Sequence, residues 1–281
     1  MRIREKSCMN SITITPTNLV DIVCPVLEGM APGALQRALV DAFDAEADSL
    51  ARIEHAFNAL TSGKPSKKAL RVFFASWSKT NNSAASVSGL ANRVTLLARS
   101  DPASPASAKL YDACGSLQRI TDEDLGALGG TLHADLFYNM ATTICGDDAW
   151  LLRANCLAAA QAFKDWTDRQ RLRNRDLMQG LLTTLVHEVY THGEVEFIHP
   201  LFKTWFEHRM NVPAERVRFV LAWVTVHTGG TESAHFAHAV QAVKTFCDAM
   251  DVRIDPASST ELFREYLRRK AAVMQECAAA L

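Results

Sequence analysis

The sequence of 281 residues lacks several features that point to common classes of protein. It has no excess of basic residues: 30 Lys and Arg stand against 31 Asp and Glu, which gives a net charge of −1. Nucleic-acid-binding proteins usually carry a strong basic excess, so we expect no nucleic-acid partner. No apolar run approaches the roughly 20 residues that span a bilayer, and the first residues contain no continuous apolar segment typical of a signal peptide. The sequence therefore predicts a cytoplasmic chain with no membrane partner.

The seven cysteines are scattered along the chain and include no Cys-x-x-Cys pair. An odd, unclustered set is typical neither of a disulfide framework nor of a structural zinc site. We expect these thiols to be reduced and to pack as small apolar side chains. The sequence also has no glycine-rich phosphate loop of either common kind, which argues against Rossmann and P-loop chemistry.

Proline is absent between Pro105 and Pro200, and the same stretch lacks alternating runs of β-branched residues. Because proline breaks helices and such runs mark strands, the sequence predicts an all-α protein with long helices. With 48% hydrophobic residues the chain can bury a large core. The expected helices cover residues 33–62, 67–77, 84–99, 106–118, 122–144, 148–168, 172–196, 200–210, 214–228, 232–250 and 259–279.

Three polar segments rich in Ser, Pro or Asn interrupt the first part of the chain, at residues 61–66, 78–88 and 100–106. They suggest an N-terminal helical part over residues 1–105 and a helical bundle over 106–281, within one continuous domain. Local signals also predict helix starts after Thr121, at Pro213 and after Ser259.

Eight of the nine histidines lie between His133 and His238, interleaved with glutamates. In the segment HEVYTHGEVEFIHP, Glu188, His192, Glu196 and His199 recur at helical spacing and share one face. That face continues an apolar stripe, so we expect it to point inward. Buried carboxylates are costly unless they are paired, protonated or bound to a cation. The segment thus fits a metal site, and it fits equally a solvent-facing cluster or a polar network at a dimer interface.

A second segment, VHTGGTESAHFAH, places three potential ligands within nine residues. Glu232 and His235 form a Glu-x-x-His pair, which helical bundles use to give two ligands to one iron. His227 lies five residues before Glu232, which regular helical spacing does not favour. Gly229 and Gly230 lie between them and permit a break in the helix.

A third segment, DEDLGALGGTLHADLF, places Glu123 and Asp124 nine or ten residues before His133. On one helix this separation is about three turns. One interpretation is a carboxylate and an imidazole that reach the same site. The other is a capped helix start followed by an unrelated buried histidine.

Together the three segments resemble the haem-oxygenase-like diiron oxidases, over about residues 106–250. The HADLF stretch is similar to the family's His-Pro-x-Leu-Phe motif, and His-x4-Glu-x2-His is one residue longer than the family's His-x3-Asp-x2-His. The resemblance implies a haem-oxygenase-like helical bundle with an N-terminal helical extension. Glu188 or Glu194 is an alternative to Glu196, and Asp124 is an alternative to Glu123. The implied candidate metal ligands are Glu123, His133, Glu188, Glu196, His227, Glu232 and His235.

The resemblance also implies a function. The family binds two non-haem iron ions (Fe) and uses O2 as co-substrate, and carboxylates with imidazoles suit iron or manganese. We therefore expect an O2-dependent oxidoreductase that acts on a small amine or amino acid, by N-oxygenation in the biosynthesis of a specialised natural product. Its implied partners are that small molecule and an electron donor, and the sequence leaves a homodimer open.

Two alternatives come from other classes. A ferritin-like diiron protein would need a second Glu-x-x-His pair in the bundle core that supplies the other iron. A metal-free helical binding or interaction protein would use the His-rich helices as a partner surface.

For an enzyme, an arginine at Arg153 or in residues 169–175 could bind a substrate carboxylate, if that run is not simply a solvated helix face. Candidate walls of a substrate pocket are Phe137, Tyr138, Trp205, Trp223 and Phe236.

Overall fold

The computed structural model describes residues 18–126 and 130–281, and in these ranges it contains helices and turns but no strand. The predicted all-α class is therefore confirmed. Most of the N-terminal stretch in which we expected no signal peptide lies outside the described residues, as do residues 127–129 of the helix predicted over 122–144. In the part of the chain that the structure describes, no helix is long and apolar enough to span a membrane.

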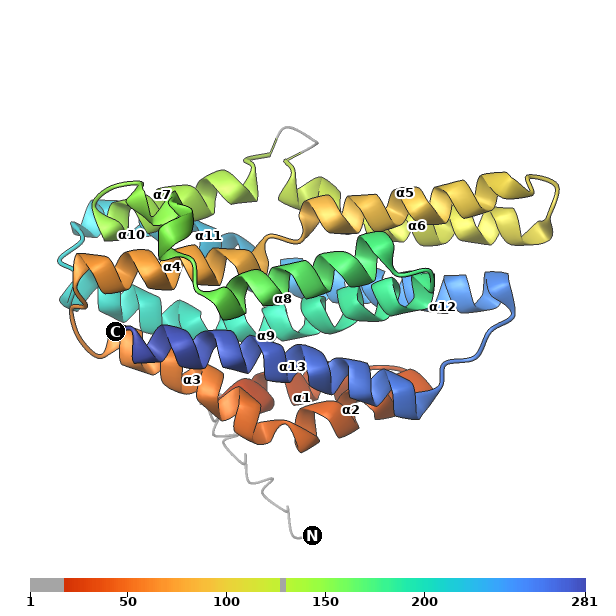
Figure 1. Cartoon of the computed structure of the whole chain (residues 1–281), viewed down its shortest axis with the longest axis horizontal. Helices are drawn as coiled ribbons and strands as arrows, with labels where there is room; N and C mark the ends of the chain where they lie inside the picture. The colour runs from red at the N-terminus through yellow and green to blue at the C-terminus, as the bar shows by residue number, and fades with distance from the viewer. Residues whose placement is uncertain (1–17, 127–129) are drawn as a thin grey trace, which may run out of the picture.

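The elements follow one another along the chain as a series of helices joined by short turns (Figure 1). In order they are α1 (Leu19–Glu28), α2 (Ala34–Ala45), α3 (Ala47–Thr61), α4 (Lys67–Asn81), α5 (Ala84–Ser100), α6 (Pro105–Asp124), α7 (His133–Cys145), the 3-10 turns η1 (Ala149–Leu151) and η2 (Arg153–Asn155), α8 (Ala158–Asp168), the π-helical turn η3 (Arg169–Arg173), α9 (Leu177–His208), α10 (Ala214–Val220), α11 (Ala222–His227), α12 (Gly230–Met250) and α13 (Pro256–Ala279).

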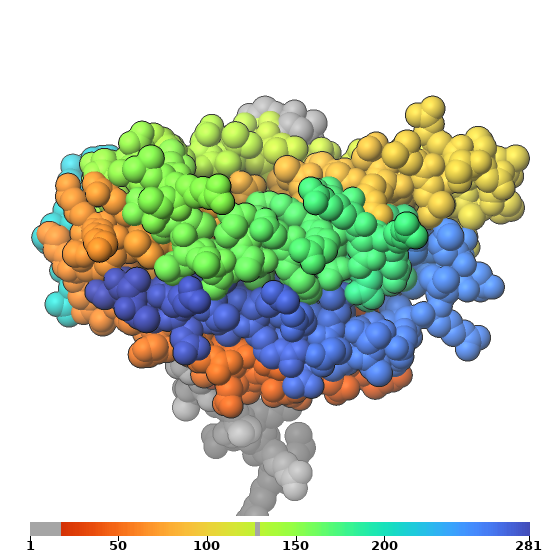
Figure 2. Space-filling model, viewed as in Figure 1, coloured from red at the N-terminus to blue at the C-terminus, as the bar shows by residue number. Residues whose placement is uncertain are grey.

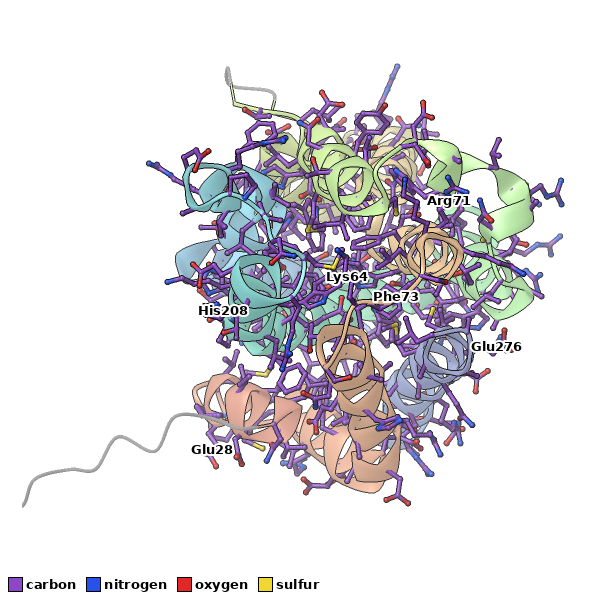
Figure 3. All side chains as sticks on the ribbon, turned by 90° about the vertical axis from the view of Figure 1, so that its left-hand side faces the viewer. Glu28, Lys64, Arg71, Phe73, His208 and Glu276 are labelled. Atoms are coloured by element: carbon purple, nitrogen blue, oxygen red, sulfur yellow. The ribbon has the colours of Figure 1, made fainter. Side chains whose placement is uncertain are left out.

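Helix α9, at 32 residues, runs through the centre of the molecule. From Gly180 to Val195 all of its residues are buried, because α1, α12, α13 and η3 pack around it. Figure 3 looks along the bundle, with the helices nearly end-on, and shows Phe73 toward the middle and Glu28 and Glu276 at the periphery. Polar side chains on α9 therefore lie inside the bundle.

The N-terminal and C-terminal parts of the chain pack against each other. Helix α13 lies on α2 and α3, and α5 and α6 form an antiparallel hairpin that extends beyond α7 (Figure 1). Helix α12 packs against both α6 and α9. These contacts bring α6, α9 and α12 together, which are three of the helices that carry the candidate metal ligands. The division of the chain at residues 105 and 106 stays a prediction.

Several predicted helix boundaries are wrong. The helix expected over 33–62 is two helices, since the chain bends at Glu46, whose buried carboxylate accepts hydrogen bonds from Ser49 Oγ at 2.7 Å and Arg264 Nε at 3.0 Å. Helix α1 was not predicted. Pro200 does not end α9, because Ile198 and Phe202 on either side of it are fully buried and hold the helix in the core.

Predicted helix starts are also corrected. Thr121 does not cap a helix: its hydroxyl donates to the carbonyl of Gln118 at 3.0 Å inside α6, which continues to Asp124. The last helix begins at Pro256, where the Asp255 carboxylate accepts from the Ser258 backbone N–H at 3.2 Å, and so Ser259 lies within it. Pro213 was expected to be the first residue of a helix. In the structure it lies one residue earlier, just before the first residue of α10.

Candidate metal site

Two adjacent groups of histidine and carboxylate side chains lie between the helices, and each could hold a metal ion. The first joins Asp124 at the end of α6, His133 at the start of α7 and His227 at the end of α11. Nδ1 of His133 lies 2.9 Å from Oδ1 of Asp124 and 3.0 Å from Nε2 of His227. The two histidines are buried, and the Asp124 side chain is 18% exposed.

The second group joins Glu188 of α9 with Glu232 and His235 of α12. Nδ1 of His235 lies 3.7 Å from Oε2 of Glu188 and 3.8 Å from Oε2 of Glu232. All three residues are 2 to 3% exposed. Because α12 packs on α9, the Glu-x-x-His pair of one helix meets the glutamate of the other in the interior.

Glu232 lies between the two groups. Its Oε1 is 3.9 Å from Nε2 of His227, and its Oε2 is 3.8 Å from Nδ1 of His235. One carboxylate therefore presents one oxygen to each group. Glu232 could therefore serve a metal ion held in either group.

The local backbone explains how His227 and Glu232 reach the same place. Helix α11 ends at His227, and α12 begins at Gly230. Gly229 between them has φ +69°, a left-handed conformation that glycine adopts without a steric cost. The break predicted from the Gly-Gly pair is confirmed. Because of it, His227 and Glu232 can face the same site although five residues on a continuous helix would point them in different directions.

The pKa values of the carboxyl groups differ across the site. Burial raises the pKa of Glu188 to about 8, and the charge of Asp124 adds to this effect. Burial and the neighbouring Glu188 raise the pKa of Glu232 well above its usual range. For Asp124, burial acts in the same direction, but hydrogen bonds with His133 and His227 outweigh it and hold the pKa below the usual range. The protein alone thus does not supply enough positive charge for three ionised carboxylates.

The residues present fit a pair of divalent metal ions. Oε1 of Glu188 and Oε2 of Glu232 are buried and have no hydrogen-bond partner among the described residues. Buried polar atoms are normally satisfied, so these two oxygens indicate a missing partner. The donor set consists of imidazole nitrogens and carboxylate oxygens without thiolates, which suits iron or manganese.

The structure places the other candidate glutamates outside the two groups. The side chain of Glu123 is 55% exposed, and its Oε2 lies 3.0 Å from Nε2 of His235. Its neighbour Asp124, and not Glu123, contacts His133. Glu196 accepts a hydrogen bond from the backbone N–H of Gly229 instead. Glu194 is fully buried and pairs with Lys270, at 2.9 Å.

A cavity of about 420 Å³ opens onto the first group. Asp124, His133 and His227 form part of its wall, and Phe137, Tyr138 and Trp223 line it as predicted, together with Trp150. Of the other predicted walls, Trp205 donates to the carbonyl of Gly63 at 2.8 Å and Phe236 is buried in the core. Arg153 lines a neighbouring cavity of about 430 Å³, and Lys79 lines both this cavity and the one beside the ligands.

Comparisons with known proteins show the fold. No family model matches the chain, and no curated protein matches its sequence. The crystal structure of a TenA homolog from Pseudomonas syringae pv. tomato str. DC3000 matches it with a TM-score of 0.64 over 88% of this chain and 97% of that chain, at 14% sequence identity. The chain has a TenA-like, haem-oxygenase-like fold. The fold class implied by the resemblance is therefore confirmed, and at this identity the match shows the fold alone.

Two cations are buried inside the bundle, and nothing in the sequence pattern predicts their burial. Arg171 is 1% exposed and donates to the hydroxyl oxygens of Thr184 at 3.2 Å and Ser86 at 3.1 Å. Lys270 is fully buried beside Glu194. Both belong to runs of basic residues that are typical of solvated helix faces, so no local pattern distinguishes them.

Proposed function

We propose that this TenA-like protein is a non-haem diiron oxidase that uses O2 to oxidise a small amine or amino acid, by N-oxygenation. The observation that carries the proposal is the position of Glu232, whose two oxygens face two separate His/carboxylate groups. A single structural metal ion would need only one such group. A pair of adjacent groups with a shared carboxylate suits two metal ions that act together.

Asp124, His133 and His227 would hold one iron, Glu188 and His235 the other, and Glu232 both. Nδ1 of His227 donates to the carbonyl of Trp223 at 2.6 Å, which leaves the lone pair of Nε2 toward Asp124 and Glu232. Glu123 accepts from Nε2 of His235 and so turns Nδ1 toward Glu188 and Glu232. When bound, the iron pair would supply the electrons that dioxygen activation requires.

The cavity beside the first group suits the proposed substrate. Aromatic side chains form its apolar wall, and Lys79 and Asp135 give it charges of both signs. An amino acid carries a carboxylate and an ammonium group, for which Lys79 and Asp135 offer the complementary charges.

The two alternatives fit these observations less well. A metal-free binding protein has no use for three carboxyl groups side by side, two of them buried with unpartnered oxygens. A ferritin-like protein would have a different fold from the one observed here. Metal content separates the metal-free case from the proposed enzyme.

The first test is iron content after anaerobic loading with ferrous iron and removal of excess metal. We expect two irons per chain, one for each of the two groups. Admission of O2 should then cause a transient visible absorption and consumption of O2. Mass spectrometry with a panel of amino acids and amines as substrates should detect an N-oxygenated product.

A matched pair of variants tests the assignment. Glu232→Gln should lose iron because it removes the shared carboxylate, while Glu196→Gln should keep both irons because Glu196 lies outside both groups. Circular dichroism checks that both variants remain helical. A wild-type protein that binds no iron above background would refute the proposed function and favour a metal-free binding protein.

A further inference from the structure

A continuous series of buried tryptophan and tyrosine side chains begins at the candidate metal site. The ring centroid of Trp223 lies 4.7 Å from that of His227, a residue of the first group. Trp223 in turn lies 5.2 Å from Trp77, with the two rings at 84°. Trp77 is fully buried on α4, so the series leads from the site into the middle of the bundle.

In the middle of the bundle, a carboxylate connects Trp77 to a tyrosine. Glu194 accepts a hydrogen bond from Trp77 Nε1 at 2.9 Å through Oε1, and another from the hydroxyl of Tyr190 through Oε2. Nζ of Lys270 lies 2.9 Å from Oε2 of Glu194 and 4.8 Å from the ring centre of Tyr190. All four side chains are at most 1% exposed. The buried ammonium group balances the charge of the carboxylate.

From Tyr190 the series continues to the surface. The ring of Tyr266 lies 5.8 Å from that of Tyr190, and the ring of Trp166 lies 6.5 Å from that of Tyr266. Trp166 on α8 is half-buried, and the guanidinium of Arg269 on α13 lies 5.3 Å from its ring. Figure 2 shows α8 and α13 side by side on the outer face of the molecule.

We propose that these residues form a route for single electrons between the outer face at Trp166 and the metal site. Its inner end rests on the proposed function. Indole and phenol rings are the side chains that lose one electron most readily apart from thiols. Here the successive ring centroids lie 5.2 to 6.5 Å apart, except between Trp77 and Tyr190, which are joined by their hydrogen bonds to Glu194. The route would carry electrons inward and so reduce a metal pair that O2 has oxidised in the absence of substrate.

The electrons and protons of this step balance. Trp223 would give one electron to an oxidised metal pair held at the site, and would be reduced in turn through Trp77, Tyr190, Tyr266 and Trp166. A soluble thiol at the surface would supply the final electron and release its proton to water, and two of the resulting thiyl radicals would combine to a disulfide. While Tyr190 lacks an electron, its hydroxyl proton lies on Glu194, and it returns when the electron does. Tyr266 can likewise share its proton with Nδ1 of His187, at 2.8 Å.

Packing alone does not explain this arrangement. Phenylalanine would fill the same space without a polar group, and a buried ion pair is often replaceable by apolar side chains at no loss of stability. Here, by contrast, the indole N–H, the phenol and the ammonium group all converge on one carboxylate in the core. That carboxylate can accept the proton which an oxidised tyrosine must release.

The test uses the metal-free protein and a photogenerated ruthenium(III) tris-bipyridine oxidant, with a cobalt(III) ammine as the terminal electron acceptor. The sequence has four tyrosines, and Tyr111 and Tyr138 are the exposed ones. In a Tyr111→Phe/Tyr138→Phe background, any tyrosyl radical must lie on Tyr190 or Tyr266, which the bulky oxidant cannot touch. We expect a tyrosyl signal in freeze-trapped electron paramagnetic resonance spectra.

Two further substitutions in that background locate the route. Trp166→Phe should abolish the tyrosyl signal, since it removes the surface end, whereas Trp77→Phe should keep it, since Trp77 lies on the far side of Tyr190. Circular dichroism and melting temperature check the fold of each variant. An undiminished signal in Trp166→Phe, or no tyrosyl signal at all in the background protein, would overturn the outer half of the route.

The inner half is tested on iron-loaded protein exposed to O2 without substrate. Trp77→Phe should accumulate oxygenated Trp223, measured by peptide mass spectrometry, while the wild type with added thiol should not. Equal modification in both proteins would overturn the connection to the site. A chain that takes up no iron would refute the proposed function and the inner half together, whereas the radical in the metal-free protein depends on neither.

Discussion

At the scale of single residues, the candidate site depends on how each histidine is oriented. Glu123 is not in either group, yet its carboxylate lies 3.0 Å from Nε2 of His235. A metal-bound imidazole commonly donates its other N–H to a carboxylate, which fixes the ring and makes it a better ligand. Glu123 is thus a positioning residue for His235.

Glu123→Gln should therefore weaken iron binding without unfolding the protein, since this side chain is 55% exposed. Loss of such an outer carboxylate typically costs about 10- to 100-fold in metal affinity. Competition with a chelator of known affinity measures the change. Asp122→Asn, next to it on α6, is the matched control, and an equal loss in both variants would contradict the specific role of Glu123.

A second residue-scale prediction concerns acid stability. The hydrogen bond from Arg71 holds the pKa of Asp147 below its usual range, and burial opposes this only in part. A depressed pKa in the folded state stabilises the protein above the usual carboxyl range, and this contribution is lost as the pH falls. The melting temperature of the wild type should exceed that of Asp147→Asn near neutral pH, and the difference should shrink between about pH 5 and pH 3. A constant difference over that range would show that the ion pair has no part in it.

At the scale of elements, close packing on α9 fixes the positions of the ligands. A Cβ atom on Gly180 would lie 2.9 Å from Leu90 Cδ1, 3.1 Å from the carbonyl oxygen of Gln170 and 3.2 Å from Cα of Arg171. The last two are backbone atoms of η3 that cannot turn aside. Gly180 therefore sets how closely η3 approaches α9, two turns before Glu188.

Gly180→Ala should destabilise the fold by about 1–3 kcal/mol, the usual cost of overpacking a core. Gly63→Ala is the control, because a Cβ atom there has no neighbour within 4 Å. Urea unfolding followed by circular dichroism compares the two. If Gly180→Ala were as stable as the wild type, η3 would have to be free to move away from α9.

At the scale of the whole molecule, the candidate metal site joins five helices, two of which, α11 and α12, are separated by the short break at Gly229. Its ligands come from α6, α7, α9, α11 and α12, which are far apart in sequence. The unfolded chain cannot offer these side chains at one place. Metal binding must therefore favour the folded state by mass action.

Ferrous iron at about 100 times its dissociation constant should add about 2.7 kcal/mol to the free energy of unfolding for each independent site. Anaerobic thermal unfolding with and without iron measures this as a rise in melting temperature, and a chelator should reverse it. Glu232→Gln should show a much smaller rise. An equal rise in the variant would place the stabilising metal elsewhere in the molecule.

The sequence by itself determined the all-α class and the three segments that meet at the site, because helical periodicity and the positions of proline and glycine are local properties. It also determined the break before α12, since Gly229 needs no partner to adopt a positive φ. Only the tertiary structure decided which carboxylate lies beside which histidine. Asp124 contacts His133 because α6 ends at the first residue and α7 begins at the second, whereas one continuous helix would separate them.

Other features followed only from packing between distant segments. Lys270 and Arg171 look solvated in the sequence and are buried because they lie on the faces of α13 and η3 that pack against neighbouring helices. Glu188 and Glu196 have the same helical face, yet α12 covers the first beside His235 while the second lies at the level of Gly229. Periodicity fixes the direction in which a side chain points, and only the neighbouring helices decide what it meets there.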